Sequence, residues 1–463
     1  MNDMKQNDMN QYVKEWFEKN EERVYQLMRE MWEKPELSLQ EYHACEIMEQ
    51  FAREEGFTEI QTHAAQDWDN PEARPNTLIA SWGSGHPVIS IVGELDALPE
   101  LGQKDVPRCE KVKGPGHGCG HNTMAGGAAG AAAAVRYALE RMGLPGTVRL
   151  IQTPGEETGQ GKTYLGYHGA FDNTDLLLMW HPAPGPLDFG PVPQQVAMRV
   201  LFEFHGTAAH AAGLRWKGRS ALDAVQLMNM GCEFLREHSE PHTMLHYCIV
   251  NGGSAPNIVP DYASSSYMFR AMDDYDAAVD LFERAVKCAE GAALMTGTTM
   301  EYKVESVVPQ FYYTLPLCEY MVREARKVPP LTYTEDEYKM TEELYRQVNQ
   351  AEPPKDREEL LPTTFLPHRE TLGECSNCTD AADMTYYCPT IHCQGLARPK
   401  QCPGHHWSAT VCAGTGVGMK AGVYAYEIIA QAAIDAFENP EIIDRCWNAW
   451  RDLGIPPHKC WLK

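Results

Sequence analysis

The sequence predicts an α/β protein that carries a second, smaller α+β domain, and two observations lead to this prediction. Three apolar stretches, 88–92, 147–153 and 175–180, have the composition of strands buried on both faces of a sheet. Residues 193–309 instead read as strand–helix–strand–strand–helix–strand, the pattern of a small sheet with two helices on one face. We therefore expect a discontinuous domain, 1–192 and 310–463, with 193–309 inserted in it.

Composition narrows the class of protein. A chain of 463 residues exceeds one ordinary core, and 43% hydrophobic with 22% charged residues is typical of a soluble globular protein. The net charge of −24 argues against nucleic acid and anionic membranes as partners. The first ten residues are polar and no apolar run reaches some 18 residues, so we expect neither signal peptide nor membrane span.

The cysteines support a cytoplasmic location. There are fifteen, an odd number, and a large protein without a secretory signal keeps its thiols reduced. Cys375 and Cys378 have the spacing of half a zinc knuckle, but the second Cys-x-x-Cys is missing. Free thiols are therefore the favoured interpretation.

Periodicity and turn residues place the individual elements. Helices are expected at 9–32, 41–55, 124–142, 220–238, 275–296, 314–326, 336–350 and 414–436. Strands are expected at 76–82, 87–93, 147–153, 174–180, 196–205, 243–251, 262–271, 299–307 and 390–394. The acidic, proline-bearing stretch 350–361 is expected to be a surface loop.

The stretch 114–122 has the strongest chemical signature. It places His117, Cys119 and His121 at every second position, with glycines between them. Thiolate and imidazole are preferred ligands of zinc and its neighbours, and glycine lets a backbone turn tightly around an ion. The alternative is a glycine-rich turn with a buried cysteine and two unrelated histidines.

Other candidate ligands also follow predicted strands. Glu94 and Asp96 follow 88–92, the pair Glu156-Glu157 follows 147–153, His181 follows 174–180, and the pair His405-His406 follows the last strand. The carboxyl ends of strands form the usual functional edge of an open α/β sheet. Each has a structural alternative: turn-capping carboxylates, a solvated glutamate pair, or a packed core histidine. Their repetition at strand ends favours a metal site.

Five motifs in this order resemble a known family. They are Gly-Glu-Leu-Asp-Ala-Leu-Pro (93–99), Gly-His-Gly-Cys-Gly-His-Asn (116–122), Thr-Pro-Gly-Glu-Glu (153–157), Trp-His-Pro (180–182) and Gly-His-His-Trp (404–407). They resemble the amidohydrolase branch of the aminoacylase/carboxypeptidase-G superfamily of co-catalytic metallopeptidases. The resemblance covers about residues 10–440 and implies a mixed-sheet, zinc-peptidase-like catalytic domain with an inserted ferredoxin-like dimerisation or lid domain.

The resemblance also implies roles for individual residues. The implied metal ligands are Cys119, His121, Glu157, His181 and His405, which would hold two divalent ions, zinc or manganese. Glu156 corresponds to the general base. His210 corresponds to a histidine of the inserted domain that reaches a neighbouring protomer's active site, and Asn257 and Arg270 correspond to residues that hold the carboxylate end of the substrate.

The chain departs from the family pattern in three places. Asn122 replaces the usual aspartate, Glu94-Leu-Asp96 replaces Asp-x-Asp, and His406 beside His405 leaves the last ligand ambiguous. Asp96 and Asn122 are therefore expected behind the ligands, and the choice of metal stays open.

The implied reaction is hydrolysis of the amide bond of an N-acyl amino acid. A dipeptidase or general deacylase is the alternative, and a non-catalytic binding protein is a third reading, disfavoured because Glu156 is present. The expected assembly is a homodimer or a hetero-oligomer with a related chain.

Overall fold

The computed structural model describes residues 2–373 and 378–462, which form two compact units. The first contains 2–191, 312–373 and 384–458, and the second contains 192–311, 378–383 and 459–462. The expected division differs here, since the sequence pattern places 378–383 and 459–462 in the larger domain. The indole of Trp461 explains part of the difference: it donates to the hydroxyl of Tyr275 at 2.7 Å and contacts the ring of Phe282 edge-on. Cys375 lies outside the described residues.

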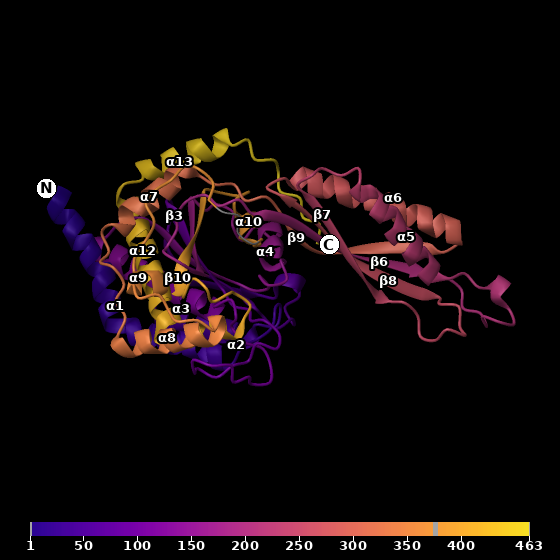
Figure 1. Cartoon of the computed structure of the whole chain (residues 1–463). Helices are drawn as coiled ribbons and strands as arrows, with labels where there is room; N and C mark the ends of the chain where they lie inside the picture. The colour runs from indigo at the N-terminus through magenta and orange to yellow at the C-terminus, as the bar shows by residue number, and fades with distance from the viewer. Residues whose placement is uncertain (1, 374–377, 463) are drawn as a thin grey trace. The chain divides into compact units, whose positions relative to one another are not determined.

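The first unit is built on a six-stranded mixed sheet in the order β1-β2-β4-β3-β5-β10 (Figure 1). The strands are β1 (Glu59–His63), β2 (Thr77–Ser84), β3 (Val88–Glu94), β4 (Gly146–Thr153), β5 (Leu176–Pro184) and β10 (Thr390–Arg398). Strands β4, β3, β5 and β10 run parallel, while β1 and β2 are antiparallel to their neighbours. The carboxyl ends of four strands therefore meet at one edge, as the positions of the motifs predict.

Helices cover this sheet because small residues let them approach it closely. Helix α3 (His121–Met142) packs on β3, and α12 (Gly416–Glu438) packs on β5 and β10. Helix α1 (Asn2–Glu33) packs on both helices. The other helices of the unit are α2 (Tyr42–Glu54), α4 (Gly161–Tyr167), α7 (Leu315–Ala325), α8 (Glu335–Asn349), α9 (Arg357–Leu360), α11 (Trp407–Ala413) and α13 (Glu441–Asp452). Helix α10 (Ala381–Met384) contains the boundary between the units.

Several elements escaped the sequence analysis, and two strands are longer than expected. Strand β1 and helices α4, α9, α10, α11 and α13 have no strong periodic signal of their own. Strand β5 runs on through His181 to Pro184 because β10 pairs with it as far as Arg398. Its other neighbour, β3, pairs only up to Met179, so the missing N–H of Pro182 costs no ladder bond on that side. His181 therefore lies within the strand.

The second unit has the ferredoxin-like topology that the resemblance implied. Its four antiparallel strands lie in the order β7-β8-β6-β9, formed by β7 (Thr243–Asn251), β8 (Tyr262–Met272), β6 (Gln195–His205) and β9 (Thr299–Val308). Helices α5 (Ala221–Arg236) and α6 (Tyr275–Thr296) pack on one face of this sheet (Figure 1). Ser220 and Asp274 cap them by accepting N–H groups of their first turns.

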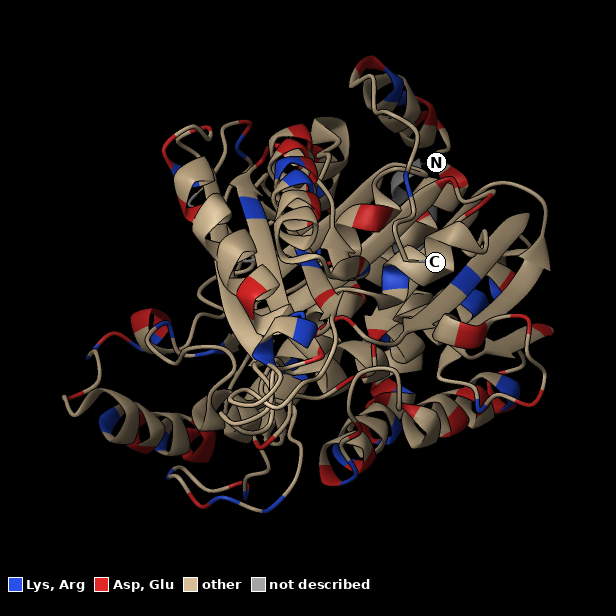
Figure 2. Ribbon diagram, turned by 90° about the vertical axis from the view of Figure 1, so that its right-hand side faces the viewer, with Lys and Arg blue, Asp and Glu red and all other residues tan. Residues whose placement is uncertain are grey.

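The charged residues lie mostly on exposed helices. Figure 2 shows Asp and Glu along these helices, interspersed with Lys and Arg. Among the described residues, no helix is both long and apolar enough to cross a membrane.

The close contact between α3 and α12 generates a stability prediction. A Cβ on Gly127 would lie 2.3 Å from the ring of Tyr426, whose hydroxyl donates to the carbonyl of Val92 at 2.5 Å and holds the ring in place. We expect Gly127→Ala to lower the free energy of unfolding by about 1–3 kcal/mol through overpacking. Urea denaturation followed by circular dichroism measures this change.

Gly291 in α6 is the matched control, because its added Cβ would meet nothing within 4 Å. Gly291→Ala should raise the free energy of unfolding by about 0.5–1 kcal/mol, the helix-propensity gain. If both variants behave alike, the α3–α12 contact is looser than described.

Candidate metal centre

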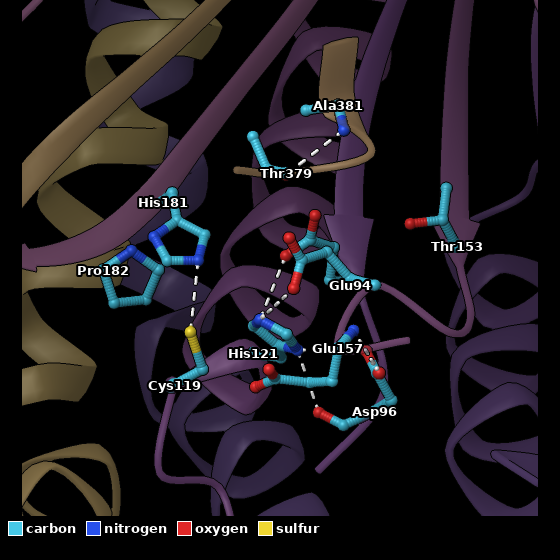
Figure 3. A network of polar contacts seen from close by, with 12 residues as sticks. Glu94, Asp96, Cys119, His121, Thr153, Glu157, His181, Pro182, Thr379 and Ala381 are labelled. Atoms are coloured by element: carbon cyan, nitrogen blue, oxygen red, sulfur yellow. Dashed lines mark hydrogen bonds and ion pairs between the residues drawn. The ribbon is translucent and has the colours of Figure 1, made fainter. Parts of the chain in front are cut away.

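Reactive side chains from five segments of the first unit converge at the carboxyl edge of its sheet (Figure 3). The segments are the end of β3, the loop before α3, the loop after β4, strand β5 and the loop before α11. The converging residues are Glu94, Asp96, Cys119, His121, Glu156, Glu157, His181 and His405.

Cys119 and His121 are positioned by the turn that leads into α3. Gly120 between them has φ = 93°, in the left-handed region that suits glycine, and its Cβ would lie 3.0 Å from Pro182. The thiol of Cys119 lies 3.3 Å from Nε2 of His181 (Figure 3). The turn thus brings a ligand of the loop against a ligand of β5.

The orientation of His121 is set by Asp96. Nδ1 of His121 lies 2.9 Å from the carbonyl oxygen and 3.0 Å from Oδ1 of Asp96, so Nδ1 carries the proton and donates. Nε2 is left as the ligand atom and faces Oε2 of Glu94 at 3.2 Å and Oε2 of Glu156 at 3.8 Å. Asp96 therefore acts behind a ligand, where carboxylates commonly orient metal-binding histidines.

The loop after β4 separates the two adjacent glutamates. Its Gly155 has φ = 62°, and the amide of Gly155 donates to Oε1 of Glu41 at 2.7 Å. The amide of Glu157 donates to Oδ2 of Asp96 at 2.9 Å. Glu157 then faces His405 and Cys119, whereas Glu156 faces His121. Neighbouring carboxylates thereby reach different partners.

His405 and His406 have different surroundings. Nε2 of His405 lies 3.3 Å from Oε2 of Glu157, and its amide donates to the carbonyl of Gly118 at 3.0 Å. Its φ of 54° is unusual for a residue other than glycine, a strain found at functional sites. His406 instead caps α11, where its Nδ1 accepts the amide of Ser408. The geometry favours His405 over His406 as a ligand.

Three overlapping sets of possible ligands result, each with its ligand atoms within 4.8 Å of one another. Cys119, His121 and His181 form the first set. Cys119, Glu157 and His405 form the second, and Glu94, His121 and Glu156 form the third. The first two share Cys119, and together they contain the five ligands implied by the resemblance.

The pKa values in the metal-free cluster show that it attracts positive charge. Burial opposes a charge on His121, but Cys119, Glu94 and Asp96 raise its pKa well above the ordinary value. Burial raises the pKa of Glu157 to about 8, helped by Asp96 and Glu94, and raises that of Cys119 to about 12. A divalent cation relieves these penalties, because it stabilises thiolate and carboxylate.

The residues also fit such an ion sterically and chemically. Nε2 of His121, Oε2 of Glu94 and Oε1 of Glu157 are buried without completing a hydrogen bond to any described residue. Buried polar atoms without partners are rare in native proteins, and a missing ion is one explanation for them. The donor set of sulfur, nitrogen and carboxylate oxygen suits zinc, and imidazole with carboxylate also suits manganese.

Two residues singled out in the metal loop lie elsewhere. The amide of Asn122 donates to the carbonyls of Met28 and Ala413, so among the described contacts it joins the start of α3 to α1 and α11 rather than to a ligand. Burial lowers the pKa of His117 to about 3, and His117 belongs to none of the three sets. Alternation with Cys119 and His121 could not reveal this difference.

His210, Asn257 and Arg270 belong to the second unit. The loops of His210 and Asn257 adjoin, because the amide of Ala211 donates to the carbonyl of Asn257 at 3.1 Å. Nδ1 of His210 accepts the amides of Ala212 and Gly213, so its proton is on Nε2. Arg270 donates to Oε1 of Gln195 at 3.0 Å.

Sequence reasoning missed two buried charged residues around this site. Glu41 holds the loop after β4 through Gly155, although its position in the sequence indicates only the start of a helix. Lys162 in α4 contacts Glu94 at 2.6 Å. A lysine directly after the glycine-rich 159–161 stretch was the available signal for Lys162, but α4 itself was not predicted.

Comparison with known proteins agrees with this geometry. A model of the peptidase family M20/M25/M40 matches residues 91–365. The chain is 29% identical to one of the two related chains of p-aminobenzoyl-glutamate hydrolase of Escherichia coli (strain K12), over 97% of this chain and 96% of that protein. It is 34% identical to Xaa-Arg dipeptidase of Homo sapiens, over 64% and 65% of the two chains.

Solved structures share the fold. An aminobenzoyl-glutamate utilization protein from Klebsiella pneumoniae has a TM-score of 0.65 at 16% identity, covering 91% of this chain and 98% of its own. A dinuclear metal-binding peptidase of the M20 family from Bacillus subtilis has a TM-score of 0.58 at 20% identity, covering 90% and 98%. The resemblance inferred from the five motifs is thus confirmed, and the chain belongs to the peptidase family M20/M25/M40 and is a hydrolase of amide bonds.

Proposed function

We propose that the first unit binds two divalent ions, zinc or manganese, and hydrolyses an N-acyl amino acid of the aminobenzoyl-glutamate type. The observation that carries the metal centre is the sharing of Cys119 by two ligand sets. One ion takes Cys119, His121 and His181, and the other takes Cys119, Glu157 and His405. The near full-length similarity to a chain of the Escherichia coli hydrolase supports the substrate class.

The two ions would polarise the scissile carbonyl and lower the pKa of a water molecule between them. Glu156 accepts the proton of the attacking water and passes it to the leaving nitrogen, as general base and then general acid. Its position next to His121, while Glu157 faces the other ligand set, suits this division of roles. Asp96 keeps His121 in the tautomer that ligation requires.

The second unit supplies the groups that recognise substrate in this proposal. Nε2 of His210 carries its proton and donates to the developing oxyanion, a contribution of about 3 kcal/mol by analogy with other oxyanion donors. The planar guanidinium of Arg270 pairs with the carboxylate of the amino acid, and Asn257 donates to the same end.

We propose that the active form is a homodimer in which His210 serves the site of the partner. Strand β7 is an edge strand with exposed Ile249 and Val250, and α5 and α6 expose Phe234 and Leu294. Unpaired edges and apolar patches of this kind are typical of contacts between protomers. A hetero-oligomer is the alternative, since the other chain of the Escherichia coli hydrolase is also similar, at 27% identity over 49% of this chain and 54% of that protein.

A cytoplasmic location completes the proposal. Its support is the cysteine chemistry: the fourteen described cysteines are all free. Persistent free thiols are typical of a reducing compartment.

The function is tested by turnover on a substrate panel with metal content measured in parallel. We expect aminobenzoyl-glutamate to be cleaved with a higher kcat/KM than Xaa-Arg dipeptides or N-acetylcysteine. Preference for the dipeptides would instead favour the activity of the human relative. Full metal content without turnover of any substrate would favour a non-catalytic binding protein.

Glu156→Gln tests the base. We expect the fold and both metals to be retained and turnover to fall by several orders of magnitude, because the ligands remain while the proton acceptor is lost. Loss of metal with turnover kept would show that Glu156 and Glu157 have exchanged roles. Metal analysis and steady-state kinetics measure the two properties.

Cys119→Ser tests the shared ligand. We expect it to weaken metal binding far more than His117→Ala, because serine is a poor donor to a borderline-soft ion and His117 lies outside the ligand sets. Metal occupancy after dialysis against a graded series of chelator concentrations measures the difference. Equal occupancy in Cys119→Ser and wild type would reduce Cys119 to a buried thiol.

Mixing of two variants tests His210. Protomers carrying His210→Ala and protomers carrying Glu156→Gln should each be inactive, but their mixed dimer has one site with both groups intact. Random pairing makes half of the dimers mixed, so roughly a quarter of wild-type activity should return. If exchange of protomers is verified by mass spectrometry and no activity returns, His210 does not act in trans.

A further inference from the structure

A buried ion pair lies directly behind the ligand cluster. Nζ of Lys162 is 2.6 Å from Oε1 of Glu94, and both side chains are fully buried. Glu94 is the last residue of β3, and Lys162 lies in the first turn of α4. Lysine is rarely buried, and a buried pair often costs more in desolvation than it returns. Stability alone therefore explains this pair poorly.

The second oxygen of Glu94 points to the same place as the metal-binding atom of His121. Oε2 of Glu94 lies 3.2 Å from Nε2 of His121, and neither atom completes a hydrogen bond to a described residue. Because Nδ1 of His121 is engaged by Asp96, Nε2 is the ligand atom. Glu94, His121 and Glu156 form one of the three ligand sets. A carboxylate so placed faces the ion that His121 binds.

Charge balance gives the lysine a reason to be present. The site gathers five side chains that are anionic when deprotonated: Glu94, Asp96, Cys119, Glu156 and Glu157. Two divalent ions would balance four of these charges, and the ammonium of Lys162 balances the fifth. Because the lysine bonds Oε1 only, it neutralises Glu94 while leaving Oε2 directed at the cluster.

We propose that Glu94 is a further metal ligand, binding through Oε2 the ion held by His121, and that Lys162 is the positioning residue that compensates and orients it. The inference rests on the proposed two-metal centre and adds a ligand that the resemblance did not imply. The first ion would then have Cys119, His121, His181 and Glu94 as its protein ligands.

Glu94→Gln alone is an ambiguous test, because it leaves an uncompensated lysine that would repel any nearby cation. We therefore pair it with the double variant Glu94→Gln/Lys162→Met, which removes both charges. The full-length metal-free protein is titrated with Zn²⁺ in competition with a chromophoric chelator, and the two dissociation constants are fitted. The readout is metal affinity rather than activity.

We expect both variants to bind one of the two ions at least about 10-fold more weakly than wild type, with the other ion less affected. The double variant is decisive, since a lost ligand stays lost after charge balance is restored. If the double variant regains wild-type affinity for both ions, the pair is only structural and the inference is wrong. If wild-type protein itself binds no zinc, the proposed centre fails instead.

A matched pair elsewhere controls for loss of a buried carboxylate. Glu324 is fully buried in α7 and accepts from Lys327 at 2.6 Å, and neither residue belongs to a ligand set. Glu324→Gln/Lys327→Met should leave both zinc affinities at wild-type values.

Folding of each metal-free variant is checked by its thermal unfolding midpoint. If the double variant does not fold, Glu94→Asp replaces it, because aspartate keeps the charge and the lysine partner but shortens the reach. Weakened binding of one ion in Glu94→Asp supports ligation by Glu94, and unchanged binding overturns it.

Discussion

The constraint on which this structure depends is the burial of several anionic groups at one point. Glu94 and Asp96 are almost completely inaccessible, and Cys119 and Glu157 lie beside them. Without cations such a cluster is costly, and its metal-free state shows the cost: the pKa of Glu157 is raised to about 8 and that of His121 well above its usual value. The cluster is therefore built to be completed by positive charge.

Asp96 holds this cluster together mechanically. Its carboxylate accepts Nδ1 of His121, the hydroxyl of Ser38 and the amide of Glu157. Burial alone would raise the pKa of Asp96, but these bonds and the neighbouring imidazole lower it to about 2. One side chain thus couples the loop before α3 to the loop after β4, so the positions of two ligands depend on each other.

The parallel strands explain why the site forms at this edge. Strands β3, β4, β5 and β10 point the same way, so the segments that follow them meet although they are far apart in the sequence. Helix α3 brings its amino end to the same edge because its alanines and glycines let it pack closely on β3 and α12. A fold that provides four strand ends can supply many ligands while each loop stays short.

The sequence by itself determined the mixed α/β class, the ferredoxin-like insertion and the ligand types, because these follow from local patterns. A strand buried on both faces is continuously apolar, and reactive residues beside such strands must meet at one edge. Contacts between distant segments decided the rest. Only the tertiary structure shows that His405 rather than His406 faces Glu157, that Asn122 bonds backbone of α1 and α11, and that Lys162 compensates Glu94. The course of β5 through Pro182 likewise depends on β10, more than two hundred residues later, because a strand ends where its partners end rather than where its own composition changes.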